Sequence, residues 1–470
     1  MKYKVHTIMK AIIVLLYFTL YFSTALFAQA KEPANDSNTP LHLLQPDYQT
    51  PYGIPSPESV KEVLDRILSY LDTETPAQVI DTRDGHPVAM PEIDSHSGLQ
   101  RGAFRLASYE WGVTYSGMLL AGEITGDKKF TDYTLKRLNF LCETAPYFRK
   151  LMEQNNNAEP QLKQLITPQA LDDAGSMCAA FIKTALQTQS SLYDDIIRNY
   201  IQWIMHGQLR LDDGVLARNR PHYHTLWLDD MFMSVPALAW MGKYSGDTAY
   251  FDEAVKQIRL FSSRVFVPEK NLFMHGWVES MEEHPAFFWA RANGWAVMTL
   301  VEVLEVLPKE HPGYDETLAL LKKHIRGLAA LQSEDGRWHQ LLDRNDSYLE
   351  TSATAIYTYA TARAINRGWI DAKVYGPCVL LAWNAISRQV NEKGQVEGVC
   401  VGTGMAFDPA FYTHRPVNVY AAHGYGPVLL AGAEIMALLQ HKYPKMNDSA
   451  VQFYDKEIQT DLPIFEENIQ

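Results

Sequence analysis

Cysteine is scarce in this chain: there are four among 470 residues, at Cys142, Cys178, Cys378 and Cys400. No two of them stand in a C-x-x-C spacing, and no group of His and Cys has the spacing of a zinc site. A glycine-rich loop of the kind that binds phosphates is also lacking. We therefore expect buried free thiols, with at most one disulfide, and neither a metal nor a nucleotide cofactor.

Basic residues are in the minority. The chain has 42 Lys and Arg against 55 Asp and Glu, which gives a formal net charge of -13. This balance argues against nucleic acid as a partner. An acidic ligand would need Arg and His groups that reverse the field locally.

Long hydrophobic runs are limited to the N-terminus. Lys2, Lys4 and Lys10 precede an apolar stretch over residues 11–28, and Ala28-Gln29-Ala30 has the small-x-small pattern of a cleavage site. We expect a signal peptide over residues 1–30, with an uncleaved anchor as the alternative. The mature protein is then exported, to the periplasm or outside the cell, and has no membrane partner after cleavage.

No linker rich in Pro, Gly or Ser divides the remainder. We expect an extended lead-in over residues 31–55, one catalytic domain over 56–445 and a peripheral tail over 446–470. The sequence carries no signal for an oligomeric state.

Two adjacent carboxylates, Asp229 and Asp230, open an otherwise apolar run. A lone Asp in such a place is most often a helix N-cap, stabilised by the helix dipole. Here the pattern recurs, because polar landmarks stand roughly every sixty residues. The landmarks are Trp111-Gly112, Asp172-Asp173, Asp229-Asp230, Arg291 with Asn293, Glu350-Thr351-Ser352 and His423-Gly424.

Each landmark precedes a helix-like run rich in small and apolar residues, and an amphipathic run then follows. Such a period is typical of an array of helical hairpins. An array of this length suggests a closed all-α toroid in which the apolar helices form a parallel inner ring. The landmarks then line one mouth, which is the end of the ring where the inner helices begin.

Several elements follow from the periodicity. We expect the first outer helix over residues 57–72, the first inner helix over 109–122 and its outer partner over 128–143. Residues 145–168 are predicted to be a loop extension, and residues 271–280 to be extended.

An internal repeat supports the array. Residues 122–130 match residues 242–250 nearly position for position. In each copy a glycine, Gly122 or Gly242, is expected to end one helix, and a Gly-Asp pair makes the turn to the next.

The landmark residues suggest chemistry on a sugar. Two carboxylates on neighbouring inner helices suit protonation of a sugar or activation of water. An acid acting near neutral pH needs a raised pKa, so burial among Trp227, Phe232 and Trp289 would have to outweigh the helix dipole. Arg291, between two Trp residues, is suited to grip a planar carboxylate. The loop ahead of Asp229 either holds an anion or forms a solvated rim; its polar residues are Arg218, Arg220, His222, Tyr223 and His224.

Over residues 100 to 440 the chain resembles the unsaturated rhamnogalacturonyl hydrolases of glycoside hydrolase family 105, which are related to the unsaturated glucuronyl hydrolases of family 88. The motifs that carry the resemblance are Leu171-Asp-Asp-Ala-Gly175, Trp227-Leu-Asp-Asp-Met-Phe-Met233, His275-Gly276-Trp277, Trp289-Ala-Arg-Ala-Asn-Gly-Trp295, Ser347-Tyr-Leu-Glu-Thr-Ser352 and His423-Gly424. The resemblance implies an (α/α)6 barrel of six helical hairpins. It also implies hydration of the double bond in a 4,5-unsaturated uronic acid at the end of a lyase-generated oligosaccharide.

The resemblance also implies roles for individual residues. It assigns Asp229 as the proton donor and then as the base for water, with Asp173 as the second carboxylate and Asp172 as its alternative. The substrate-binding positions are Tyr115, Trp227, Met233, His275, Trp289, Arg291 and Trp295. Alternatives are another (α/α)6 sugar enzyme, such as an inverting glycosidase or an epimerase, or a carbohydrate-binding surface protein.

Overall fold

A computed structural model describes residues 34–39, 44, 50–51, 53–155, 159–447 and 450–457. The chain divides into two units, and the larger one, Pro51–Lys445 with Val451–Gln459, contains the helices discussed below. The predicted signal segment lies outside the described residues, so its role stays a prediction.

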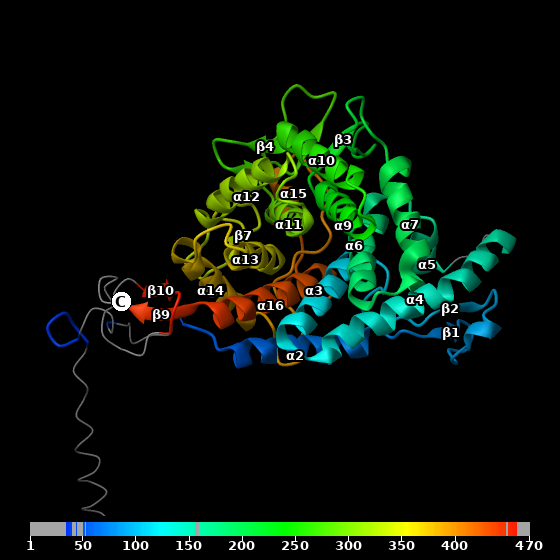
Figure 1. Ribbon diagram of the computed structural model, residues 1–470, viewed down its shortest axis with the longest axis horizontal. Coiled ribbons are helices and arrows are strands. Elements are labelled where there is room, and N and C mark those ends of the chain that lie inside the picture. The colour runs from blue at the N-terminus through cyan, green and yellow to red at the C-terminus, as the bar shows by residue number, and fades with distance from the viewer. Residues whose placement is uncertain are drawn as a thin grey trace, which may run out of the picture. The chain divides into compact units, whose positions relative to one another are not determined.

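Among the described residues, six helices form an inner ring (Figure 1). Each packs against the next one along the chain, and the last packs against the first, so the ring is closed. They are α3 (Tyr109–Thr125), α6 (Leu171–Thr188), α9 (Val235–Ser245), α11 (Ala290–Val306), α13 (Thr351–Asn366) and α16 (Tyr425–His441). The predicted all-α (α/α)6 barrel is confirmed.

The outer helices are α2 (Pro57–Glu74), α4 (Lys128–Asn155), α7 (Asp194–Gln202), α10 (Ala249–Val265), α12 (Tyr314–Ala329) and α14 (Ala372–Arg388). Five of them follow their inner partner in the chain, as predicted. The sixth pair differs, because the partner of α16 is α2, from the opposite end of the chain. No helix follows α16 in the part of the chain that the structure describes; β9 (Tyr443–Asn447) and β10 (Ala450–Tyr454) do.

The two rings differ in how their side chains are buried. α13 is buried from Thr351 to Ile365 on every side, as its small and apolar residues allow. α2 buries one stripe at helical spacing, including Val60, Leu64 and Leu71, and exposes the opposite face. α16 is long and apolar enough to cross a membrane, but 89% of the relevant window is buried within the ring.

The internal repeat marks equivalent helix ends, one turn later than predicted. α3 and α9 continue past Gly122 and Gly242 to Thr125 and Ser245. The capping residues that follow, Gly126 and Gly246, adopt left-handed φ values of 69° and 75°. Each of these capping residues donates its N–H to the carbonyl of the glycine four residues earlier. Glycine accepts this conformation without the steric cost that other residues meet.

Residues 145–168 were predicted to be a loop, and this is wrong. α4 continues to Asn155, and α5 (Pro160–Ile166) follows. Leu162, Leu165 and Ile166 of α5 are buried, so packing makes this segment helical despite its polar composition.

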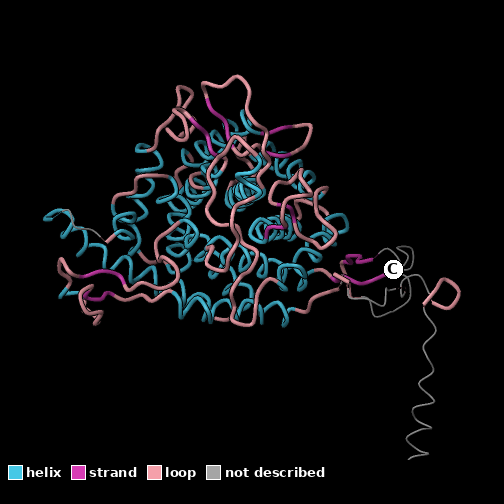
Figure 2. Tube along the Cα trace, turned by 180° about the vertical axis from the view of Figure 1, so that it is seen from behind, coloured by secondary structure: helices cyan, strands magenta, loops and turns pink. Residues whose placement is uncertain are grey.

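The strands are short and form two-stranded sheets (Figure 2). β1 (Val79–Asp81) pairs with β2 (Ser97–Leu99), β3 (Thr225–Trp227) with β6 (Gly276–Val278), β4 (Phe266–Val267) with β5 (Leu272–Phe273), and β7 (Trp338–His339) with β8 (Leu349–Glu350). Two short helices, α8 (Asp229–Phe232) and α15 (Pro409–Thr413), complete the surroundings of the site. All four cysteines are free thiols.

Candidate active site

The inner helices begin at one end of the ring, as predicted. The Tyr109 hydroxyl at the start of α3 lies 2.6 Å from Nε2 of His423, just ahead of α16. Ser176 of α6 donates to the Tyr109 carbonyl at 2.6 Å, and Arg291 of α11 donates to Ser352 of α13 at 3.3 Å. These bonds between first and second turns bring the polar landmarks to a common mouth.

The register of β3 on β6 brings Asp229 and His275 together. Trp227 is paired with Gly276, so the residue after one strand lies beside the residue before the other. Leu228 donates its N–H to the His275 carbonyl at 2.8 Å. The side chains then meet, with His275 Nε2 at 3.0 Å from Asp229 Oδ2.

His275 is oriented from its other side by Tyr412 of α15, whose hydroxyl lies 2.7 Å from Nδ1. An ionised carboxylate only accepts hydrogen bonds, so Nε2 of His275 donates to Asp229. Trp289 packs against the imidazole with ring centroids 4.7 Å apart. The arrangement fixes the direction in which His275 faces the carboxylate.

Asp229 opens α8 without capping it, since no side-chain cap bond is formed at this helix. The capping interpretation therefore does not explain this carboxylate, whose side chain is 13% exposed. Burial raises its pKa, but the hydrogen bond and charge of His275, with Arg218 beyond, hold the pKa below its usual value. The predicted raised pKa is wrong for the ligand-free site.

Asp230 and Asp172 are held by one buried guanidinium. Arg218 is 6% exposed, donates from Nε to Asp230 at 2.6 Å, and donates from its two terminal nitrogens to the oxygens of Asp172 at 2.9 and 2.8 Å. Burial raises the pKa of Asp230, against the opposing effect of Arg218. The second Asp of the doublet is thus an anchor that ties α8 to α6.

Asp173, unlike Asp172, is not bound by Arg218. It accepts the backbone N–H of Gln169 at 2.8 Å, and burial raises its pKa. Gln169, whose N–H it accepts, lines a cavity of about 520 Å³ together with Ala170, Asn219 and Arg220.

Arg291 is engaged by the protein itself. Its terminal nitrogens donate to the carbonyls of Cys400 at 2.8 Å and Val401 at 2.6 Å. Arg291 was predicted to bind a substrate carboxylate. In this structure its terminal nitrogens are hydrogen-bonded to backbone carbonyls instead, so they are not free to bind one. Arg291 instead holds the 400–401 segment over the first turn of α11.

Most of the predicted binding residues are packed beneath the mouth rather than open to it. Tyr115 donates its hydroxyl to the Leu106 carbonyl at 2.8 Å, as a core residue does, and Trp295 stacks on Phe232. The predicted residues that are no more than 1% exposed are Tyr115, Met233, His275, Trp289, Arg291 and Trp295. Trp227 is only partly buried, and direct binding by the buried six stays a prediction.

Arg220 is the exposed cation beside Trp227. Its guanidinium lies 4.7 Å from the centre of the indole ring, and 58% of its side chain is exposed. Its contact with Asp172 is long, at 3.4 Å. Within this loop, Arg218 is therefore buried and paired with aspartates, whereas Arg220 is exposed and open to an anion.

Sequence reasoning missed Tyr109, Glu110, whose carboxylate lies 3.6 Å from Nε2 of His423, and Tyr412. The first two could have been found, since they open the first inner helix just as the other landmarks open theirs. Tyr412 had no local signal, because it lies 137 residues from His275 and depends on how α15 folds back.

The profile of Glycosyl Hydrolase Family 88 matches residues 81–439. The chain belongs to this family. It is a glycoside hydrolase, and the predicted relationship to families 105 and 88 is confirmed.

Two relatives are similar in sequence to this family 88 member. It is 27% identical over 262 residues to the unsaturated rhamnogalacturonyl hydrolase of Bacillus subtilis, which covers 54% of this chain and 74% of that protein. It is 31% identical over 215 residues to an unsaturated 3S-rhamnoglycuronyl hydrolase of an Alteromonas strain, which covers 45% of this chain and 51% of that protein. The chain thus spans about half the length of the Alteromonas enzyme.

Among solved structures, a possible family 105 member from Salmonella enterica superposes with a TM-score of 0.65 at 22% identity. The superposition covers 86% of this chain and 98% of that one. At this identity the likeness establishes the fold.

Proposed function

We propose that this family 88 enzyme releases a 4,5-unsaturated uronic acid from the non-reducing end of oligosaccharides left by a polysaccharide lyase. The observation that carries the proposal is the partly exposed carboxylate of Asp229, held by a buried histidine at the mouth of the barrel. The names of the two relatives support the substrate class.

The proposed reaction is hydration of a vinyl ether. Asp229 donates a proton to C4, which leaves an oxocarbenium-like centre at C5. Asp229, now a carboxylate, takes a proton from the water that adds to C5. The resulting hemiketal collapses and releases the neighbouring sugar, so the enzyme returns to its starting state after each turnover.

Asp229 must take up a proton for this role, because its pKa is low in the free site. A bound substrate supplies two causes, since its carboxylate repels the ionised form and its ring excludes water. Both raise the pKa of Asp229 when the substrate is in place. We assign Asp173 as the second carboxylate, because Asp172 is occupied by Arg218.

Arg220 is the group we assign to the substrate carboxylate in place of Arg291. It is exposed, and it stacks on the tryptophan that lies next to His275, with ring centroids 6.2 Å apart. Arg218 is occupied by two aspartates and Arg291 by two carbonyls. A planar fork on an aromatic face suits a carboxylate.

The test is the ultraviolet absorbance of unsaturated uronyl disaccharides, whose conjugated double bond disappears on hydration. Wild type should remove the absorbance, and Asp229→Asn should be slower by at least about 10²-fold, the lower range for a general acid. Asp212→Asn, an exposed carboxylate in a neighbouring loop, is the control and should act as wild type does. Persistence of the absorbance with wild type across pectic, ulvan and glycosaminoglycan fragments would refute the proposal.

We also propose that the protein is exported, on the strength of the N-terminal lysines and the apolar stretch that follows them. Mass spectrometry of the protein from producing cells should find a mature N-terminus just after Ala30. An intact N-terminus on the cytoplasmic side would contradict this.

A further inference from the structure

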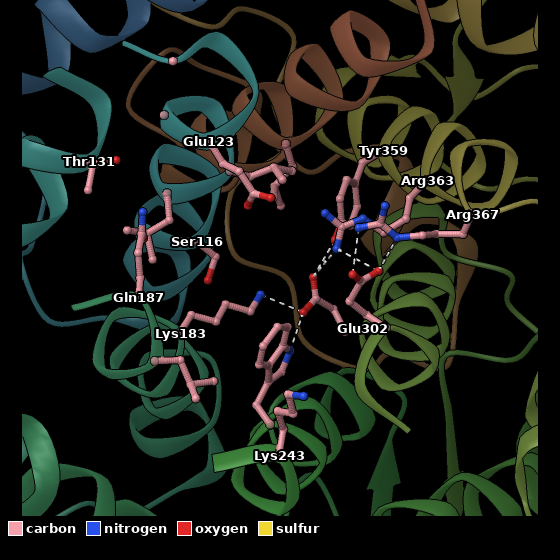
Figure 3. Close-up of a pocket in the computed structure, with 18 of the residues that line it drawn as sticks. Ser116, Glu123, Thr131, Lys183, Gln187, Lys243, Glu302, Tyr359, Arg363 and Arg367 are labelled. Atoms are coloured by element: carbon pink, nitrogen blue, oxygen red, sulfur yellow. Dashed lines mark hydrogen bonds and ion pairs between the residues drawn. The ribbon is translucent and has the colours of Figure 1, made fainter. Parts of the chain in front are cut away.

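A second cavity, of about 690 Å³, lies at the end of the ring remote from Asp229 (Figure 3). Its lining comes mainly from the middle and last turns of the inner helices, with Lys128 and Thr131 of the outer helix α4, whereas the mouth is built from the first turns of the inner helices. Every inner helix contributes to it. One lining residue from each is Glu123 of α3, Lys183 of α6, Trp240 of α9, Glu302 of α11, Tyr359 of α13 and Leu430 of α16.

The floor of this cavity centres on Glu302, whose side chain is 2% exposed. It accepts hydrogen bonds from Lys183 at 2.7 Å, from Trp240 Nε1 at 2.8 Å and from the Tyr359 hydroxyl at 2.5 Å. Figure 3 shows Lys183 of α6 and Tyr359 of α13 reaching toward the Glu302 carboxylate. The floor is therefore already assembled without a ligand.

The charges of the floor are paired. Lys183 pairs with Glu302, Arg363 pairs with Glu434 at 2.6 Å, and Arg367 pairs with Glu305 at 2.7 Å. Each of these three cations is therefore already paired with a carboxylate, although that of Glu434 lies outside the lining. A charged ligand would pay desolvation without a free counter-charge in the floor.

The rim offers hydrogen-bonding groups that are not in use. Glu123, Gln187 and Lys243 are exposed and have no hydrogen-bond or ion-pair partner among the described residues. They provide an acceptor, an amide that both donates and accepts, and a donor. The lining also contains leucines and the partly exposed indole of Trp240, which give the cavity apolar surface.

We propose that this far-end cavity is a second binding site for an uncharged saccharide unit. Sugar hydroxyls both donate and accept, as the rim requires, and the C–H faces of a sugar ring suit the apolar wall. The volume falls in the range of small-molecule sites. The site is separate from the catalytic mouth and does not depend on the reaction assigned to it.

Binding should be measured on full-length protein by saturation-transfer NMR, with glucose, galactose, rhamnose and cellobiose as probes and glucuronate as the charged comparison. The measurements use the Asp229→Asn variant, so that the catalytic site does not convert any probe. We expect binding of at least one neutral sugar, weakened at least about tenfold by Gln187→Ala and by Lys243→Ala. Lys322→Ala, at an exposed position on α12, is the control and should leave binding unchanged.

The rim variants lie on the surface, so their melting temperatures should match wild type and separate lost binding from lost folding. Trp227→Ala, at the mouth, should leave the neutral sugar bound. The proposal is overturned if no neutral sugar binds, if glucuronate binds more tightly than glucose, or if Trp227→Ala removes binding that the rim variants retain.

Discussion

At the scale of single residues, the contact between Asp229 and His275 decides the protonation of the proposed acid. His275 lowers the pKa of Asp229 against the raising effect of burial. Because the proposed first step needs protonated Asp229, kcat/KM should be high below the free-site pKa of Asp229 and fall above it.

Replacing His275 by Ala removes the group that lowers this pKa. We therefore expect the falling limb of kcat/KM to move to higher pH, together with a loss in kcat. The limb is measured from initial rates of absorbance decay between acid and neutral pH. His441→Ala, at the exposed last residue of α16 and so at the far end of the ring, should keep the wild-type profile. An unmoved or downward-shifted limb in His275→Ala would show that His275 does not set the pKa of Asp229.

Arg220→Ala should raise KM by roughly 10-fold or more with little change in kcat, as expected when a charged hydrogen bond to bound substrate is lost. The diagnostic comparison is the methyl ester of the unsaturated uronyl substrate. Wild type should prefer the free acid, and the variant should not. Arg259→Ala on α10 serves as the control. If Arg220→Ala still preferred the free acid, a group other than Arg220 would bind the substrate carboxylate.

At the scale of elements, the position of Asp229 depends on the close approach of α6 to the turn between α8 and α9. A Cβ built on Gly175 would lie 1.8 Å from the Met233 carbonyl oxygen. Backbone cannot yield as a side chain does, so only glycine permits this packing.

Gly175→Ala should therefore destabilise the protein by about 1–3 kcal/mol or more, the usual cost of overpacking, and should also reduce kcat by moving α8. Gly294→Ala is the matched control on α11, where the nearest atoms to the new Cβ belong to the Ile356 side chain rather than to backbone, the closest being Cδ1 at 3.0 Å. Denaturant unfolding gives the stabilities. Equal values for the two variants would show that α6 shifts freely.

At the scale of the whole molecule, the far end of the ring is held by ion pairs between helices. Burial raises the pKa of Glu302, but Lys183 and Arg363 outweigh it and lower the pKa to about 2. An unfolded glutamate has a pKa near 4.3, so this pairing contributes stability above that pH and loses it as the pH falls toward about 2.

Glu302→Gln should cost roughly 3–5 kcal/mol at neutral pH, since it leaves buried cations without their carboxylate. The difference in melting temperature between wild type and variant should shrink as the pH falls from about 4.3 to about 2. Glu62→Gln, at an exposed position on α2, should behave as wild type does. A difference that stays constant across this pH range would mean that Glu302 is not ionised in the folded protein.

Much of this protein could be read from the sequence alone. Burial repeats locally along a helix, so the spacing of small, apolar and polar residues determined the hairpins, the ring and the end at which its landmarks meet. Asp229 could be singled out in the same way, because a carboxylate in an apolar run needs a specific reason. The glycine repeat predicted equivalent helix ends, and only the last turn was misplaced.

The tertiary structure decided which partner each landmark meets. Arg291 bonds to carbonyls 109 and 110 residues away, Arg218 reaches Asp172 across 46, and α16 pairs with the outer helix α2 from the opposite end of the chain. No local period encodes such pairings, because they depend on strand register and on how distant segments pack. The sequence determined the mouth, because the polar landmarks recur at the starts of the inner helices. The far-end cavity depends on how the last turns of those helices pack together, which only the tertiary structure shows.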